Sequence, residues 1–257
     1  MTRHLITFSG SDYDATTKRI VESAPWCGAD EIYIFDDVWM FEQDFTKLHG
    51  NRWLWEHPHP RCVGFCAWKP FLLTYMFDRM KPGDSVVYTD ADAPPVASLA
   101  PIFEIAERDG AWLSASQGHK QSKWCKRDAY LTMGHSGPLE EQAGCARFLA
   151  LRKGAWREQQ LLAEWLTYSC NRYANSKDPS VLSGNEYPDF EQHRDEQAIL
   201  TNLAHKNKIK LHREADQTGE DPSCFHVDRE LYGQLFEQVH STRGNNGLGS
   251  RFRRVPA

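Results

Sequence analysis

The sequence predicts an α/β fold whose mixed, mostly parallel sheet is flanked by helices. Short β-branched and aromatic runs alternate with segments of helical periodicity over the first two-thirds of the chain. Two of these runs, "EIYIFDD" (31–37) and "SVVYTD" (85–90), end in carboxylates. Ligands of open α/β sheets bind beyond the carboxyl ends of the strands, so these acids mark the expected site. The chain has 257 residues, 40% of them hydrophobic, which suits one large domain or two small ones.

The first half of the chain contains three predicted strands and two predicted helices. Pro70 falls in the first turn of the second helix, where a missing N–H is harmless. The aromatic stretch 38–63 shows no clear period. The predicted order is strand 4–9, helix 14–24, strand 31–37, helix 65–80 and strand 85–90.

The second half continues the alternation. Gly110 ends the first of its helices, and the polar stretch 175–190, which carries Pro and Gly, is predicted to be a loop. The predicted order is helix 101–110, strand 111–116, short helix 123–134, strand 146–154, amphipathic helix 155–173, helix 193–207 and short strand 208–212.

Composition narrows the class of protein. A formal charge of −5 removes the electrostatic reason to expect nucleic-acid binding. No apolar run is long enough to span a membrane, and the N-terminus does not resemble a signal peptide, so a cytoplasmic protein is expected. The seven cysteines are scattered, which fits reduced thiols better than a disulfide framework or a zinc site.

The C-terminal stretch "RGNNGLGSRFRRVPA" carries four arginines among glycines: Arg243, Arg251, Arg253 and Arg254. Three interpretations stay open: a frayed terminus, a flap that faces phosphates, and a contact with anionic lipids at the inner face of a membrane.

Asp90 and Asp92 are the candidate metal ligands. Residues two apart in a strand share a face, and two carboxylates on one face repel unless a cation lies between them. Carboxylates without histidine or thiol neighbours suit Mn²⁺ or Mg²⁺, which bind diphosphates. The structural alternative is an acidic turn that caps the next helix, with Pro94 and Pro95 setting its start.

Five motifs in order then resemble the glycosyltransferases of the GT-A fold, in particular a group of bacterial and viral sugar transferases. They are "GFCAWKP" (64–70), "PGDSVVYTDAD" (82–92), "WCKRDAYLTMG" (124–134), "SGNEYPDF" (183–190) and "HRDEQAILTNL" (193–203). The resemblance covers about residues 4–212. Two positions depart from the pattern: Cys66 replaces an aromatic residue, and Glu196 replaces an aspartate.

The resemblance implies a nucleotide-sugar donor, a Mn²⁺ or Mg²⁺ cofactor and transfer to a hydroxyl of a glycan or small acceptor. Asp92 would bind the metal, and Asp90 would share it while contacting ribose or sugar hydroxyls. Thr89, which precedes them, is assigned to the donor as well. Lys69 and Arg127 would bind donor phosphates or sugar hydroxyls; the structural alternative for Lys69 is a snorkelling side chain on a buried helix.

The remaining assignments also follow from the resemblance. Thr7 and Ser9, at the end of the first strand, would receive the nucleoside. Glu196 would orient donor or acceptor sugar, and Gln197 would support positive charge on the anomeric carbon. His240 is placed as a third metal ligand, with an exposed structural histidine as the alternative. The pattern favours retention of anomeric configuration.

The implied organisation is a single GT-A-like domain over 1–257. Residues 1–115 form its nucleotide-sugar half, 116–240 its acceptor and catalytic half, and 241–257 a flexible basic tail that contacts a membrane peripherally. Two other functions stay open: a non-catalytic carbohydrate-binding module on the same fold, and a nucleotidyltransferase. The second normally needs a Gly-rich basic phosphate loop, which "TFSGSDYD" does not supply.

Overall fold

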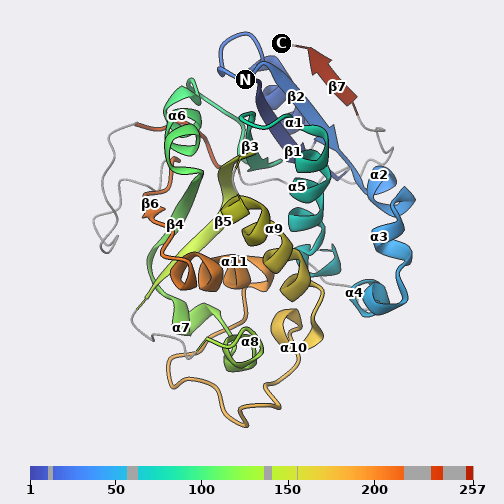
Figure 1. Ribbon diagram of the computed structural model, residues 1–257, viewed down its shortest axis with the longest axis vertical. Coiled ribbons are helices and arrows are strands. Elements are labelled where there is room, and N and C mark those ends of the chain that lie inside the picture. The colour runs from blue at the N-terminus through green and yellow to red at the C-terminus, as the bar shows by residue number, and fades with distance from the viewer. Residues whose placement is uncertain are drawn as a thin grey trace.

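A seven-stranded sheet in the order β6-β4-β5-β3-β1-β2-β7 forms the centre of the molecule in a computed structural model (Figure 1). The structure describes residues 1–10, 14–56, 63–135, 141–154, 156–216, 233–239 and 253–256. The strands are β1 Arg3–Phe8, β2 Glu31–Phe35, β3 Ser85–Asp90, β4 Ala111–Lys120, β5 Gln142–Arg152, β6 Leu211–His212 and β7 Arg253–Pro256.

Helices cover both faces of this sheet. The longer ones are α1 Asp14–Glu22, α5 Trp68–Arg79, α6 Ala100–Asp109, α9 Trp156–Ser169 and α11 Asp195–Lys206. The shorter ones are α2 Asp37–Glu42, α3 Asp44–Lys47, α4 Arg52–Glu56, α7 Gln121–Trp124, α8 Arg127–Thr132 and α10 Arg172–Asn175, with 3-10 turns η2 His49–Asn51 and η3 Val63–Cys66.

The period of two along the strands divides the core into two layers. Ile6 and Tyr88 face a cluster that α5, α9 and α11 complete, whereas Leu5 and Val87 face a second cluster with α1 and α6. Successive strand side chains point to opposite faces, so a strand buried on both sides reads as a continuous apolar run. This is why the run "VVY" (86–88) is apolar throughout.

The α/β fold class and the mixed sheet are confirmed, but the parallel majority is not found. Among the described residues, three strand pairings are parallel and three are antiparallel. β5 enters the sheet between β3 and β4 and runs antiparallel to both. A buried run is apolar in either direction, so the pattern that located β5 carried no information on its orientation.

Two local predictions also differ from the structure. The helix predicted over 123–134 is two short helices, α7 and α8, because Cys125 and Lys126 between them are extended. The irregular stretch 38–63 contains α2, α3 and α4, each too short to show a helical period in the sequence.

The chain returns to the sheet near its C-terminus. Residues 253–256, expected to belong to a flexible tail, form β7 and pair antiparallel with β2. β2 would otherwise be an edge strand with unpaired backbone groups, which a further strand satisfies. Residues 241–252 of the expected tail lie outside the described residues.

The expectation of reduced thiols is wrong for Cys66, which is disulfide-bonded to a cysteine outside the described residues. Cys27, Cys125, Cys145 and Cys170 are free thiols. Scattered spacing gave no signal for the bridge. Among the described residues, no helix is both long and apolar enough to cross a bilayer.

Candidate active site

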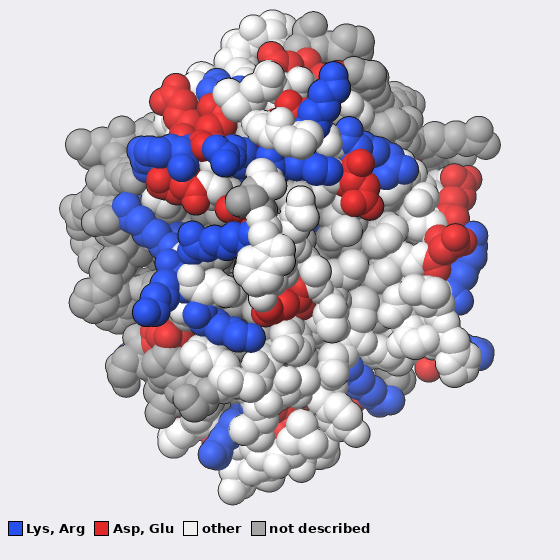
Figure 2. Space-filling model, in the orientation of Figure 1, with Lys and Arg blue, Asp and Glu red and all other residues white. Residues whose placement is uncertain are grey.

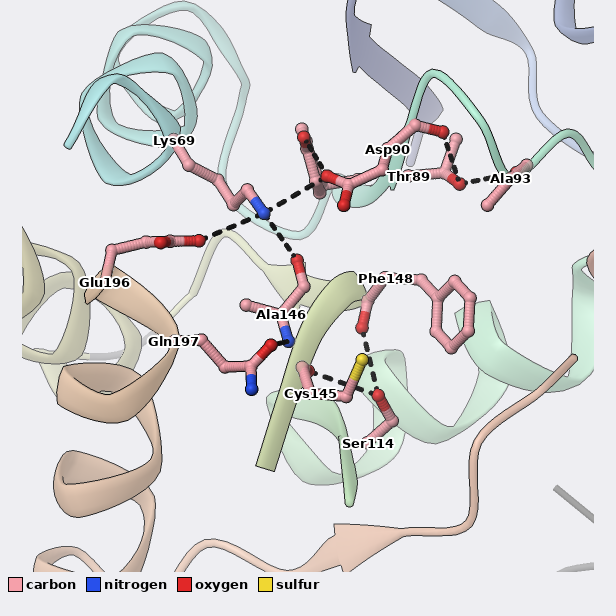
Figure 3. A network of polar contacts seen from close by, with 11 residues as sticks. Lys69, Thr89, Asp90, Ala93, Ser114, Cys145, Ala146, Phe148, Glu196 and Gln197 are labelled. Carbon is pink, nitrogen blue, oxygen red and sulfur yellow. Dashed lines mark hydrogen bonds and ion pairs between the residues drawn. The ribbon is translucent and has the colours of Figure 1, made fainter. Parts of the chain in front are cut away.

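Lys69 joins the carboxyl end of β3 to the first turn of α11 (Figure 3). Its Nζ lies 3.1 Å from Asp90 Oδ1, 3.1 Å from Glu196 Oε1 and 2.9 Å from the Ala146 carbonyl oxygen. The side chain is only 3% exposed. A buried ammonium with three oxygen partners is fully satisfied, so Lys69 holds two acids from distant parts of the chain in fixed positions.

The protonation of this cluster follows from its burial. Burial alone would lower the pKa of Lys69, but the charges of Asp90 and Glu196 outweigh it and raise the pKa, so Lys69 stays a cation. Burial raises the pKa of Glu196 to about 7, although the Lys69 ammonium opposes that shift. Glu196 therefore titrates near neutral pH.

Strained backbone lies just before both members of the Lys69–Glu196 pair. Gly64, Phe65 and Cys66 have φ values of 63°, 51° and 53°, a left-handed stretch that turns the chain into α5. Asp195, directly before Glu196, has φ 51° and forms an ion pair with Lys177 at 3.1 Å. Such conformations are costly for residues with a Cβ and cluster at functional sites.

Asp90 and Asp92 have different surroundings. Asp90 Oδ1 accepts from the Tyr88 hydroxyl at 2.5 Å as well as from Lys69. Asp92 Oδ1 is buried without a hydrogen-bond partner. Burial, followed by the negative charge of Asp90, raises the pKa of Asp92 to about 6, while Arg147 and Lys69 lower it. The Asp92 carboxylate is thus the uncompensated group of the site.

These two acids fit a divalent cation. A buried carboxylate oxygen without a donor is the group that a hard cation would satisfy, and Asp90, whose contacts with Tyr88 and Lys69 use Oδ1, would offer its second oxygen to the same ion. Within the described residues, no three His, Cys, Asp or Glu side chains meet as a metal site. Any further protein ligand must come from elsewhere in the chain.

The C-terminal segment 233–239 runs alongside residues 92–96. Val239 N–H donates to the Asp92 carbonyl at 2.8 Å, Glu237 N–H to Pro94 at 3.1 Å, and Val96 N–H to Leu235 at 2.8 Å. His240, the expected third ligand, follows Val239 directly in sequence and lies outside the described residues.

Arg147 is a site cation that the sequence reasoning missed. It lies on β5 next to Ala146, and its Nη1 is 3.0 Å from Asp216 Oδ2, a fully buried carboxylate. Burial would lower the pKa of Arg147, but neighbouring groups, Asp90 among them, raise it, and its charge in turn lowers the pKa of Asp92. The available signal was an arginine within the apolar run "ARFLAL", since a charge in a buried strand needs a partner.

Other predicted site residues are held by local hydrogen bonds. Gln197 Oε1 accepts from Ala146 N–H at 3.3 Å, which brings Gln197 beside the Lys69 cluster (Figure 3). The Thr89 hydroxyl donates to the Ala93 carbonyl at 2.7 Å and so shapes the turn that carries Asp90 and Asp92.

The predicted nucleoside residues lie at the end of β1. Thr7 pairs in register with Thr89 of β3, and its hydroxyl is buried without a hydrogen-bond partner. The Ser9 hydroxyl is 2.6 Å from that of Thr17 on α1. Both lie at the carboxyl edge of the sheet that Asp90 occupies, but no contact joins them to Lys69 or Asp90.

Arg127 is not brought to the Lys69 cluster by any contact in the described part of the chain. It begins α8, where its N–H donates to Glu186 at 2.8 Å and its guanidinium lies 5.6 Å from the centre of the Tyr187 ring. His193 is buried nearby, and its Nδ1 accepts from Lys126 N–H at 3.2 Å. The role of Arg127 in donor binding stays a prediction.

Comparison with solved structures identifies the fold. The chain is similar to the crystal structure of mouse xyloside xylosyltransferase 1 in its apo form, with a TM-score of 0.53 and 10% identity over 96% of this chain and all of that one. The galactosyltransferase LgtC, solved with donor and acceptor sugar analogues, gives a TM-score of 0.47 at 14% identity over 92% and 86% of the two chains. No protein-family model and no curated protein sequence matches. The chain has the GT-A fold of glycosyltransferases.

Proposed function

We propose that this protein is a metal-dependent glycosyltransferase that moves a sugar, a hexose or a sugar of similar size, from a nucleoside diphosphate to a hydroxyl acceptor. The observation that carries the proposal is the Oδ1 oxygen of Asp92, which is buried without a hydrogen-bond partner just beyond the end of β3, two residues after Asp90, in a GT-A fold. A folded chain gains nothing from an uncompensated buried acid, so a ligand is its natural explanation.

Asp92 and the second oxygen of Asp90 would hold Mn²⁺ or Mg²⁺, which when bound supplies positive charge to the donor diphosphate. Arg147 lies near enough to both acids to add a second positive charge from β5. Lys69 is occupied by Asp90, Glu196 and Ala146, so it orients these groups rather than binding phosphate itself. The proposed role of Lys69 thus differs both from a direct phosphate contact and from a snorkelling side chain, since its ammonium is buried.

We further propose that the anomeric configuration is retained. Inversion needs a carboxylate that takes the proton of the acceptor hydroxyl. Asp90 and Glu196 each have an oxygen held by Lys69 in the buried cluster, which fixes both carboxylates toward the lysine, and Asp92 is assigned to the cation. Gln197, held by Ala146 N–H, has an uncharged amide that can face a cationic anomeric carbon.

The test is release of nucleoside diphosphate from a panel of nucleotide sugars with Mn²⁺, with and without simple sugar acceptors. D92N is expected to abolish release and to weaken Mn²⁺-dependent binding of nucleoside diphosphate by at least about tenfold, the loss of one charge-assisted contact. D78N, which changes an exposed acid on α5, is the matched control and keeps both properties. The anomeric form of the product, read by NMR, tests retention.

Two outcomes would contradict the proposal. Release that persists in D92N would remove the metal role of Asp92. Binding of sugars without binding of any nucleotide would favour the carbohydrate-binding module. A nucleotidyltransferase would instead release pyrophosphate from a nucleoside triphosphate and a sugar phosphate, which the same assay with those substrates detects.

Arg147 gives a second, independent test. R147Q is expected to weaken nucleoside diphosphate binding by about tenfold or more, because charged hydrogen bonds to phosphate are lost. R147Q also removes the Arg147 partner of the buried Asp216 carboxylate, so the double variant R147Q/D216N separates binding from folding. The proposal requires that the double variant regain stability without regaining affinity.

A further inference from the structure

A basic surface surrounds the N-terminus of α9. Lys and Arg side chains gather on the upper and left part of the face in Figure 2, whereas much of its lower right is uncharged. The chain as a whole has a formal charge of −5, so this face has the opposite sign to the molecule. We use the name α9 basic face for the cations of three stretches that contact one another around this helix end: Lys81, Lys153, Arg157, Lys206, Lys208 and Lys210.

Backbone contacts bring these cations together from three stretches of chain. Gly83 N–H donates to the Lys153 carbonyl at 2.5 Å, which places the 81–84 turn beside the end of β5. Arg157 Nη2 donates to the Asn207 carbonyl at 3.0 Å, which places the start of α9 beside the end of α11. The grouping is therefore part of the fold and not a chance overlap in one view.

Acidic side chains neutralise part of this surface: the charge of Lys210 acts on Asp109 and helps to lower the pKa of that carboxyl. Lys206 pairs with Glu164 at 3.4 Å, but the structure gives no ion pair to Lys81, Arg157 or Lys208 within the part of the chain it describes. Glu158, on the same helix, is buried. The α9 basic face is thus available to an anionic partner.

A single large apolar side chain projects from the middle of these charges. Trp156, the first residue of α9, is 75% exposed. The other exposed large hydrophobic residues of the described chain lie outside these stretches, for example Phe41 on α2 and Tyr173 on α10. An indole amid lysines and arginines is the composition of a segment that rests in the headgroup layer of an anionic bilayer.

We propose that the α9 basic face docks on anionic lipid headgroups, with Trp156 inserted at the interface. Single-stranded nucleic acid, the main alternative, is held by several stacking aromatics along a charged groove. Among the described residues of this face, Trp156 is the one large exposed aromatic side chain, which favours a lipid surface. The proposed surface is distinct from the C-terminal arginines, and it does not depend on the proposed transferase activity.

The test is co-sedimentation of the full chain with vesicles of phosphatidylcholine alone or with about one third phosphatidylglycerol, at about 0.1 M salt. Each lysine near an anionic surface contributes about fivefold to the partition constant, so K206Q/K208Q/K210Q is expected to bind about 100-fold more weakly. W156A is expected to bind several-fold more weakly at every salt concentration, because its contribution is apolar. Circular dichroism confirms that each variant folds.

The matched control is K18Q/K47Q/K123Q, which removes the same charge from α1, α3 and α7. The vesicle binding of this control is expected to stay within about twofold of that of the parent, apart from the long-range effect of the changed net charge. Equal losses in both triple variants would overturn the proposal, as would equal binding to neutral vesicles. Tighter binding to a single-stranded oligonucleotide than to anionic vesicles would show that the face serves nucleic acid instead.

Discussion

Replacing Lys69 by methionine tests whether the lysine is the central support of the site. Methionine keeps most of the aliphatic chain but removes the ammonium that lies 3.1 Å from both Asp90 and Glu196. Glu196 is then a buried acid without a cation, and the Ala146 carbonyl loses its donor. Breaking a buried ion pair by removing one partner costs about 3–5 kcal/mol of unfolding free energy.

The magnitude can be measured by urea unfolding. For a chain of this size the same loss lowers Tm by roughly 6–20 °C, at about 2–4 °C per kcal/mol. K47M, at a lysine 61% exposed on α3, is the control and should change stability by less than about 0.5 kcal/mol. The double variant K69M/E196Q removes the stranded charge and should recover at least about 1 kcal/mol relative to K69M.

Two results would refute this reasoning. K69M within about 1 kcal/mol of the parent would mean that solvent reaches the acids and replaces the ammonium. A double variant no more stable than K69M would mean that the loss comes from packing and not from the unpaired Glu196 charge. In either case the ion pairs of Lys69 would not be what holds Asp90 and Glu196 in place.

Three further predictions concern other parts of the fold. D128A should lower the unfolding free energy by about 2–4 kcal/mol and expose the 176–194 loop to proteases, because the Asp128 carboxylate accepts hydrogen bonds from the backbone N–H groups of residues 181–183. The control is D189A, which removes a carboxylate of the same loop that accepts one hydrogen bond, from the Ser122 hydroxyl. Burial raises the pKa of Glu141 to about 7, so the parent loses stability relative to E141Q as pH rises from about 4.5 to 7. Urea unfolding at these two pH values should show that the difference in unfolding free energy between parent and E141Q changes by about 1–2 kcal/mol, a figure discounted for the partial exposure of Glu141. The same difference at both pH values would contradict the prediction. G110A places a Cβ 2.0 Å from Glu158 Oε1, whereas G83A, at a glycine of similar φ, places its Cβ in open space. G110A should therefore lower the unfolding free energy by at least about 1 kcal/mol more than G83A. Equal losses would mean that backbone strain alone, and not the contact with Glu158, destabilises G110A.

Most of the regular structure was predictable because local periodicity reports burial. β1, β3, α6, α9 and α11 lie within four residues of their predicted bounds. The three helices have a helical period, and the two strands are short β-branched and aromatic runs. The orientation of β5 was not predictable in this way, because a strand buried on both faces is apolar in either direction. β7 was missed because its pairing with β2 is a contact between the two ends of the chain.

The sequence predicted where the candidate site lies in the sheet, but not which distant residues contact one another there. Two acids at the end of a buried strand located the carboxyl edge of the sheet. The Lys69 bridge to Glu196 joins the starts of two helices that no local pattern relates. Arg147 was overlooked because it interrupts an apolar run, yet its partner Asp216 lies far along the chain, where sequence alone does not pair the two.

Asp90 and Asp92 differ in whether the folded chain itself supplies partners for their carboxylate oxygens. Asp90 has Lys69 and Tyr88 as partners, so its position is stabilised within the folded chain. Asp92, two residues on, has a buried oxygen without a donor, and the charge of Asp90 adds to the cost of ionising it. The nearby Arg147 guanidinium, which pairs with Asp216, only partly offsets that cost. Such an acid destabilises the folded chain by itself, whereas a cation bound between Asp90 and Asp92 would stabilise it. Because a ligand that binds only the folded state stabilises that state, the metal should raise Tm as well as support activity.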